Sequence, residues 1–198
     1  MVSRMKRLHL LPARVLHWKT MRICIVLLVV SLCLVPELFS QQPETVSEGE
    51  IKAAFIYNFI KFVEWPSSAF PATGRHIIIY VLGQDGVTKA LEKLSGRIAQ
   101  GRAITVKYTS DPTEMTQSHV VYVGQSEKDR MKTLINAIPK HVLTISDVQS
   151  FAASGGIINF YTAEKKVSFV INIDAAERAG LKCSSQLLRL ARIMKETR

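Results

Sequence analysis

The sequence is poor in cysteine. Three of its 198 residues are cysteine, and two of them, Cys24 and Cys33, fall within the first 40 residues. Only Cys183 remains in the rest of the chain, so a domain formed by that part cannot contain an internal disulfide. Its stability must come from an apolar core, which a chain of roughly 155 residues is long enough to bury.

The sequence also lacks the short motifs that accompany catalysis, metal binding and nucleotide binding. It contains no GxSxG, HxH or CxxC spacing, and its segment from Gly83 to Gly86 is not a GxGxxG motif. Ser184 and Ser185 stand at an expected helix start, where capping accounts for them. Nothing assembles an acid, a base and a nucleophile. We therefore expect a protein that binds rather than an enzyme, with no cofactor and no metal.

The first 40 residues differ in composition from the rest of the chain. Six basic residues and no acid occupy residues 1–22, and an apolar run from Ile23 to Val35 follows. A basic start, an apolar core of about 7–15 residues and a polar exit are typical of a signal peptide, whereas a membrane-spanning helix needs about 20 apolar residues. We expect a signal peptide over 1–40, a short linker over 41–49 and one domain over 50–198. The protein is then periplasmic, with an uncleaved N-terminal anchor as the alternative.

Loss of the expected signal peptide changes the charge of the protein. The whole chain has 26 basic and 16 acidic residues, a net charge of +10. Without residues 1–40 it keeps 20 basic and 15 acidic residues, a net charge of +5. A charge of this size is typical of a solvated surface, and no basic run is interleaved with aromatic residues. We expect no nucleic-acid partner.

Helical and strand patterns alternate after residue 50. Helices are predicted over residues 50–65, 87–94, 126–138 and 186–195, and strands over 76–82, 103–108, 119–123, 142–145, 157–162 and 167–173. The last two strands flank a polar turn, which indicates a hairpin. Strands that alternate with helices favour a mostly parallel sheet. The expected fold is therefore a three-layer α/β domain, with helices on both faces of a mostly parallel sheet and a C-terminal antiparallel hairpin.

Local sequence patterns predict how several of these elements begin and end. Capping patterns at Ser126, Ser146 and Asp174 are expected to open helices. Gly155 and Gly156 are expected to permit a tight turn before the strand at Ile157, because glycine adopts backbone conformations that other residues avoid.

The helix predicted over residues 50–65 has two distinct faces. At 100° per residue, Ile51 and Phe55 fall with the other large apolar residues on the side expected to be buried. Ala53 and Ala54 fall on the other side, together with a polar and aromatic stripe of Tyr57, Asn58, Lys61, Glu64 and Trp65, in which Lys61 and Glu64 are close enough to pair. The stripe is either a solvated face with Trp65 tucked under the next loop or a contact surface, since Tyr and Trp are enriched at binding hot spots.

Polar residues are also expected at both edges of the sheet. Asp85 and Asp147 each follow the carboxyl end of a strand, where open α/β sheets often bind ligands, although helix capping is the simpler role for each. His76, His119 and His141 each precede a strand and would share the opposite edge. A metal site there is geometrically possible, but no metal-ligand spacing supports it.

Three segments of the chain resemble the YfiR family. The opening segment is Ala53-Ala54-Phe55-Ile56-Tyr57-Asn58-Phe59-Ile60-Lys61-Phe62-Val63-Glu64-Trp65-Pro66. A middle region combines Val142–Asp147, Phe151-Ala152, Gly155-Gly156 and Phe169–Ala176, and the tail runs from Ala179 to Arg192. The similarity spans residues 50 to 194, and the end motifs are long and unusual in combination.

The resemblance implies a periplasmic α/β protein without enzymatic activity. It also implies a homodimer that holds an inner-membrane diguanylate cyclase inactive by binding its periplasmic sensor region, which lowers cyclic di-GMP and disfavours biofilm formation. Tyr57, Asn58, Lys61, Glu64 and Trp65 are then the expected partner-binding residues. The alternative is a periplasmic small-molecule-binding protein with a pocket at Asp85 and Asp147. Some family members depend on disulfides, which Cys183 alone cannot form within one chain.

Overall fold

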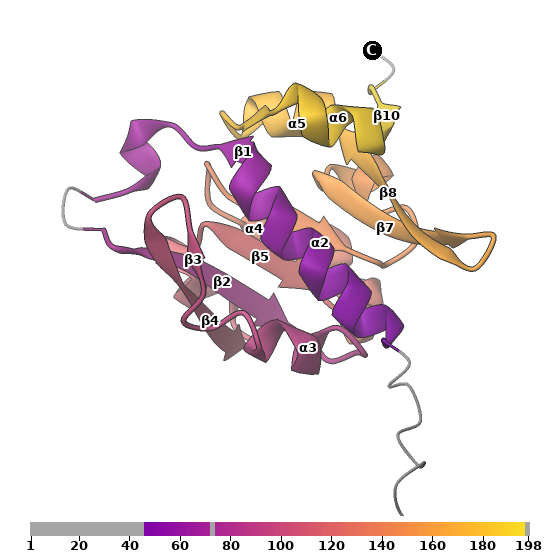
Figure 1. The fold of residues 1–198 in the computed structure, drawn as a ribbon, viewed down its shortest axis with the longest axis horizontal. Coiled ribbons are helices and arrows are strands. Elements are labelled where there is room, and N and C mark those ends of the chain that lie inside the picture. Colours follow the sequence, from indigo (N-terminus) through magenta and orange to yellow (C-terminus); the bar gives the residue numbers. More distant parts are fainter. Residues whose placement is uncertain (1–45, 72–73, 197–198) are drawn as a thin grey trace, which may run out of the picture. The chain divides into compact units, whose positions relative to one another are not determined.

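The structure, a computed structural model, describes residues 46–71 and 74–196 (Figure 1). A compact unit begins at Val46. The first described helix starts at Glu48 with Ser47 as its N-cap, so both residues of this helix start fall within the expected linker. The expected signal peptide lies outside the described residues. Among the residues that are described, no helix is both long enough and apolar enough to cross a membrane.

An eight-stranded sheet forms the centre of this unit. Its strand order is β10-β8-β7-β6-β5-β2-β4-β3. The strands are β2 (His76–Leu82), β3 (Ile98–Ala99), β4 (Arg102–Thr109), β5 (Val120–Val123), β6 (Leu143–Ser146), β7 (Ile158–Ala163), β8 (Lys166–Asn172) and β10 (Arg192–Met194). Pairs β4–β2, β2–β5, β5–β6 and β6–β7 are parallel, and β7–β8 is an antiparallel hairpin. The predicted fold class is confirmed.

Helices cover both faces of the sheet because its central strands are apolar on both sides. The described helices are α2 (Glu48–Phe62), α3 (Thr88–Glu92), α4 (Met131–Ala137), α5 (Ile173–Arg178) and α6 (Ser185–Leu190), with 3₁₀ turns η1 (Ser67–Ala69), η2 (Pro112–Gln117), η3 (Gln125–Arg130) and η4 (Ala152–Ser154). In β2, Ile77, Ile79 and Val81 pack in the core with α2, whereas Tyr80 and Leu82 pack with α4 on the other side. Alternate side chains of a strand point to opposite faces.

Helix α2 lies across one face of the sheet (Figure 1). It begins two residues before the predicted start, because Ser47 and Glu50 form a capping box. It ends at Phe62 rather than Trp65, because Val63 and Glu64 form strand β1 (Val63–Glu64), which pairs with β9 (Lys182–Cys183).

The predicted faces of this helix need two corrections. Ile51 is exposed and Ala53 is buried against α3 and the sheet, the reverse of the prediction. The contacts to α3 extend the buried side of α2 beyond the half of the helical wheel that an isolated sheet would cover.

Three predicted helix starts differ from the structure, and their side chains make contacts that the local pattern does not show. The Ser126 hydroxyl accepts from the backbone of Gln84, and residues Gln125–Arg130 form a 3₁₀ turn before α4. The Ser146 hydroxyl donates to the Val123 carbonyl in the neighbouring strand, and only the short turn η4 follows. Asn172, not Asp174, caps α5.

The C-terminal segment contains a strand where the sequence predicts a continuous helix. Ser184 caps α6 as expected, but α6 ends at Leu190, and Arg192–Met194 pair in parallel with β8. Leu187 is buried while Leu190 is exposed. Without β10, the edge of β8 would leave backbone N–H and C=O groups unpaired, and residues 192–194 bond to them. The amphipathic pattern of residues 186–195 contains no sign of this pairing.

Candidate functional site

The predicted partner-binding residues lie along the outer side of α2 and the strand that follows it. Phe59, Ile56 and Ile60 on the inner side are fully buried, and Phe59 packs edge-on against Phe169 of β8. This packing fixes the rotation of the helix. It therefore determines which side chains face outward.

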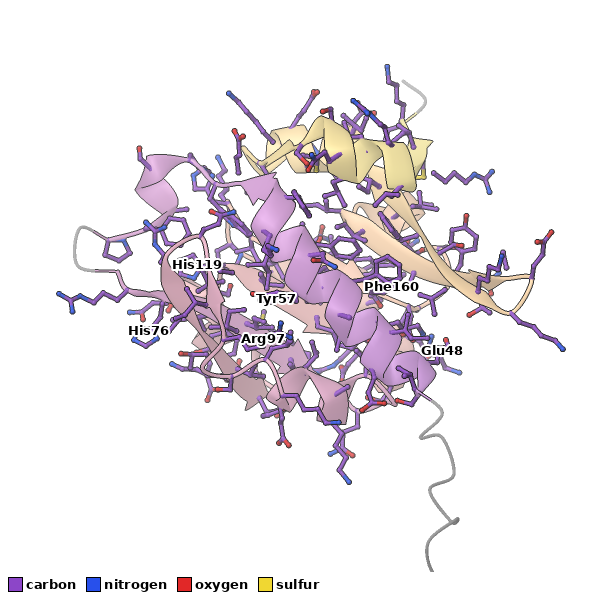
Figure 2. All side chains as sticks on the ribbon, in the orientation of Figure 1. Glu48, Tyr57, His76, Arg97, His119 and Phe160 are labelled. Carbon is purple, nitrogen blue, oxygen red and sulfur yellow. The ribbon has the colours of Figure 1, made fainter. Side chains whose placement is uncertain are left out.

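Tyr57 is held in place by the hairpin formed by β3 and β4. Its hydroxyl donates to the Ile98 carbonyl at 2.9 Å, and the Arg97 guanidinium lies 3.8 Å from the centre of its ring. Figure 2 shows Tyr57 and Arg97 beside each other at the middle of α2. The sequence reasoning did not include Arg97, because a contact between residues 40 positions apart leaves no local signal. The stacked cation adds positive charge to this surface.

Trp65 is half-buried where the chain leaves β1. Its indole nitrogen donates to the His119 carbonyl at 3.3 Å, and its ring lies edge-on to Phe70, with 6.3 Å between centroids. Trp65 is therefore tied to the start of β5 and to the loop after η1. It does not project freely into solvent.

Asn58, Lys61 and Glu64 are the exposed members of the predicted set. Among the described residues, no ion pair joins Lys61 to Glu64, because the helix ends between them and Glu64 is opposite Lys182 in the β1–β9 ladder. The outer face of α2 and strand β1 together present an amide, a cation and a carboxylate between two half-buried aromatic rings. We call this set with Arg97 the α2 surface.

Asp85, at the carboxyl edge of the sheet, is occupied by contacts within the chain. One carboxylate oxygen accepts from the backbone of Val87 at 2.7 Å and of Thr88 at 3.1 Å, which fixes the start of α3. The other accepts from the Tyr122 hydroxyl at 2.7 Å. Burial, followed by the charges of Asp147 and Asp85, raises the pKa of Tyr122. Tyr122 therefore stays protonated and acts as a donor.

Asp147, at the same edge, is paired with Lys52 of α2. The distance from Lys52 Nζ to Asp147 Oδ2 is 2.7 Å, and the same ammonium lies 2.8 Å from Glu48 Oε1. Lys52 is 7% exposed. Burial alone would lower the pKa of Lys52, but the hydrogen bonds and charges of Asp147 and Glu48 raise it. Lys52 therefore stays charged, and its ion pair with Asp147 ties α2 to the sheet.

Sequence reasoning missed Lys52, although a signal for it exists. Lys52 precedes Ile56 by four positions and Phe59 by seven, which places it on the apolar side of the helix. A lysine in that stripe needs a buried partner. The walls of five cavities that border the described residues contain neither Asp85 nor Asp147.

Gly155 and Gly156 lie in the turn before β7. Gly155 has φ = +104°, a conformation that side chains disfavour. A Cβ at Gly156 would lie 2.2 Å from the ring of Phe151, which is closer than any van der Waals contact. Gly155 is thus explained by its backbone conformation, and Gly156 by the lack of room for a side chain.

The three histidines share the amino edge of the sheet, as predicted. His76 begins β2, His119 precedes β5 and His141 precedes β6, and these strands are parallel neighbours. The Nδ1 atom of His76 lies 3.0 Å from Thr105 Oγ1, and that of His141 lies 2.9 Å from the Ala179 carbonyl. Within residues 46–71 and 74–196, no three His, Cys, Asp or Glu side chains are grouped so that they could hold a metal ion.

Cys183 is a half-buried thiol in β9. Burial raises the pKa of Cys183 to about 11, so the thiolate is scarce at neutral pH. A disulfide between two chains would need that thiolate to form first.

Comparison with known proteins reveals both a family and two distant structures. One solved structure, a conserved domain protein from Vibrio cholerae, is 13% identical, with a TM-score of 0.48 over 76% of this chain. Another, an ABC domain in complex with L-Trp from Streptococcus pneumoniae, is 10% identical, with a TM-score of 0.42 over 60% of this chain. This chain spans 60% and 55% of those two proteins. Residues 49–192 match the family described as YfiR/HmsC-like, and this range covers α2 and almost every strand of the sheet. The chain therefore belongs to the YfiR/HmsC-like family.

Proposed function

We propose that this protein is a periplasmic regulatory binding protein that represses an inner-membrane diguanylate cyclase. It binds the periplasmic sensor region of the cyclase and so lowers cyclic di-GMP. The observation that carries the proposal is membership of the YfiR/HmsC-like family over residues 49–192, because this is a family of periplasmic regulators without catalytic activity. The proposal includes an N-terminal signal peptide over residues 1–40, a linker over 41–49, a domain over 50–198 and assembly as a homodimer.

The α2 surface is the proposed contact with the cyclase. Its two aromatic side chains, Tyr57 and Trp65, are held by hydrogen bonds to backbone carbonyls. These side chains therefore lose little conformational entropy when a partner binds. Lys61 and Arg97 add positive charge beside them. Rigid aromatic residues with neighbouring cations are the residue types most frequent at binding hot spots. An acidic or aromatic segment of the sensor region fits such a surface.

The test is capture of the membrane partner by the protein as it is recovered from the cell envelope. The protein is incubated with detergent-solubilised inner membrane, and captured proteins are identified by mass spectrometry. We expect a cyclase with a periplasmic sensor region. A folded sample that captures no such cyclase would contradict the proposal.

Matched variants locate the contact. Lys61→Glu combined with Asn58→Ala should reduce capture at least tenfold, because both side chains are exposed and neither supports the core. Lys132→Glu changes an exposed charge on α4, on the other face of the sheet, and should capture normally. In cells, the double variant should raise cyclic di-GMP towards the level of a deletion strain. Unchanged capture by the double variant would move the contact away from the α2 surface.

A further inference from the structure

A cavity of about 480 Å³ lies at the amino edge of the sheet, where β2, β5 and β6 begin. Its wall includes all three histidines that precede these strands, together with Arg75 and Lys140. Figure 2 shows His76 and His119 at this same end of the sheet. The volume is within the range of small-molecule sites, about 300–1,000 Å³.

The wall of this cavity is basic. Arg75 and Lys140 each carry a full positive charge, and no Asp or Glu contributes to the lining. Neither forms an ion pair with a carboxylate of the described residues. These cations therefore lack the internal partners that Lys52 has at the opposite edge. Two unpaired cations beside a partly enclosed space favour a negatively charged ligand.

His119 adds a buried hydrogen-bond donor to the wall. His119 is only 5% exposed, and its Nδ1 atom accepts a hydrogen bond from the backbone N–H of Ile78 at 3.1 Å. A ring nitrogen that accepts this bond carries no proton, so in the neutral ring the proton is on Nε2. Nε2 is buried and has no hydrogen-bond partner in the described part of the chain. A buried donor without an acceptor is costly, and a bound ligand would remove that cost.

The environment of His119 keeps this ring neutral and fixed in position. Burial lowers its pKa and the positive charge of Arg102 adds to that shift, while the Ala69 carbonyl near the ring opposes it without coming into hydrogen-bonding geometry with Nε2. Phe70 stacks on the ring with 4.5 Å between centroids and 15° between planes, and the Arg102 guanidinium lies 4.0 Å above Phe70 on its other side. The ring therefore cannot rotate freely to find another partner.

The rest of the wall is suited to an apolar group. Ala69, Pro71, Ile78 and Pro139 border the cavity beside the basic residues. We propose that this cavity binds a small organic anion, whose carboxylate or phosphate group lies against Arg75 and Lys140 and accepts from His119 Nε2, and whose apolar part contacts Ile78 and the prolines. Trp65 of the α2 surface bonds to the His119 carbonyl, but no residue of the α2 surface is in the cavity wall, so the site can be tested whatever the outcome for the cyclase.

The first experiment compares ligands that differ in charge. Phenyl phosphate, benzoate, benzyl alcohol and benzylamine are titrated into the purified protein and followed by calorimetry. At least one of the two anions should bind saturably, with a Kd of about 1 mM or tighter for ligands of this size. The neutral and cationic compounds should bind at least tenfold more weakly. Equal binding of all four compounds, or no binding of either anion, overturns the proposal.

Variants then test the residues. Arg75→Ala, Lys140→Ala and His119→Asn should each weaken the anion about tenfold, because each removes a charged or charge-assisted contact. The asparagine side chain keeps an oxygen that can accept from Ile78, whereas the Nε2 donor of the ring is lost. Lys132→Ala removes an exposed charge outside the cavity and should leave the affinity unchanged. Arg75 and Lys140 are exposed, so their variants should fold even where His119→Asn does not. If Arg75→Ala and Lys140→Ala both leave the affinity for the anion unchanged, the proposal is overturned.

A direct readout concerns the proton on Nε2. In protein labelled with ¹⁵N-histidine, His119 should show the neutral tautomer protonated at Nε2 before ligand is added. Saturation with the anion should shift that Nε2–H resonance, because the proton gains an acceptor. A resonance that shows protonation at Nδ1, or one that does not respond to a bound anion, contradicts the proposed contact.

Discussion

The two edges of the central sheet both collect polar residues, but they differ in how those residues are satisfied. At the carboxyl edge, Asp85 receives bonds from Tyr122 and from α3, and Asp147 is paired with Lys52. At the amino edge, Arg75 and Lys140 have no internal carboxylate partner among the described residues, and His119 Nε2 has no acceptor. The carboxyl edge is therefore held together by its polar groups, while at the amino edge Arg75, Lys140 and the Nε2 atom of His119 stay available.

The carboxyl edge also contains one buried polar atom without a hydrogen-bond partner. Asp147 Oδ1 is buried without a hydrogen-bond partner in the described part of the chain. The Tyr122 hydroxyl lies near both carboxylates but has a single proton, which it donates to Asp85. The other oxygen of Asp147 still pairs with Lys52, so the charge as a whole is compensated. A cluster of polar residues thus indicates a ligand site only where the groups do not satisfy one another.

The largest effect should come from breaking the ion pair at the carboxyl edge. Lys52→Met should lower the free energy of unfolding by about 3–5 kcal/mol, because it leaves the Asp147 carboxylate buried without its partner. Urea unfolding measures this. The double variant Lys52→Met with Asp147→Asn should recover most of the loss. A single variant as stable as Lys132→Met would show that the pair does not support the fold.

A smaller loss is expected from the hydroxyl that joins β5 to Asp85. Tyr122→Phe should destabilise the protein by about 1–2 kcal/mol, since it removes one buried hydrogen bond to a carboxylate that keeps its bonds to α3. Thermal or urea unfolding is sufficient to measure it. Tyr161→Phe, at an exposed tyrosine of the hairpin, is the matched control and should change stability by less than about 0.5 kcal/mol.

At the amino edge, His119→Asn should cost about 1 kcal/mol and change the dependence of stability on pH. Because burial lowers the pKa of His119, the unfolded chain binds the proton more readily than the folded one. This histidine therefore destabilises the fold as pH falls below about 6.5, its unfolded value. The variant should lose stability less steeply between pH 7 and 5 than the wild type. Equal slopes would contradict this interpretation.

The smallest effects on stability are expected at the rim of the amino-edge cavity. Arg75→Ala and Lys140→Ala should each change the free energy of unfolding by less than about 0.5 kcal/mol, because both side chains are exposed. Losses comparable to that of Lys52→Met would mean that these cations are structural. The contrast between the two edges would then disappear.

The sequence was sufficient to predict the order and type of most elements. Strand β2 was predicted over His76–Leu82 and occupies those residues, because a run of large apolar residues bounded by turn residues is a strong local signal. The hairpin of β7 and β8 was predicted from the polar turn between two strand patterns, and it is present. The end of α2 and the strand at Arg192–Met194 were not, because pairing with β9 and β8 depends on residues far away in the sequence.

Some features of the candidate sites were also predictable from the sequence, and others were not. The α2 surface follows from helical periodicity and family resemblance, and the shared edge of the three histidines follows from parallel strands. Local sequence could not show that Lys52 is the partner of Asp147, that Arg97 stacks on Tyr57, or that His119 has a donor without an acceptor. Periodicity is a property of neighbouring residues, so the sequence by itself determined most of the elements, the main division of α2 into two faces, and the family. Only the tertiary structure decided which polar groups satisfy one another, since that depends on distances between residues up to 114 positions apart.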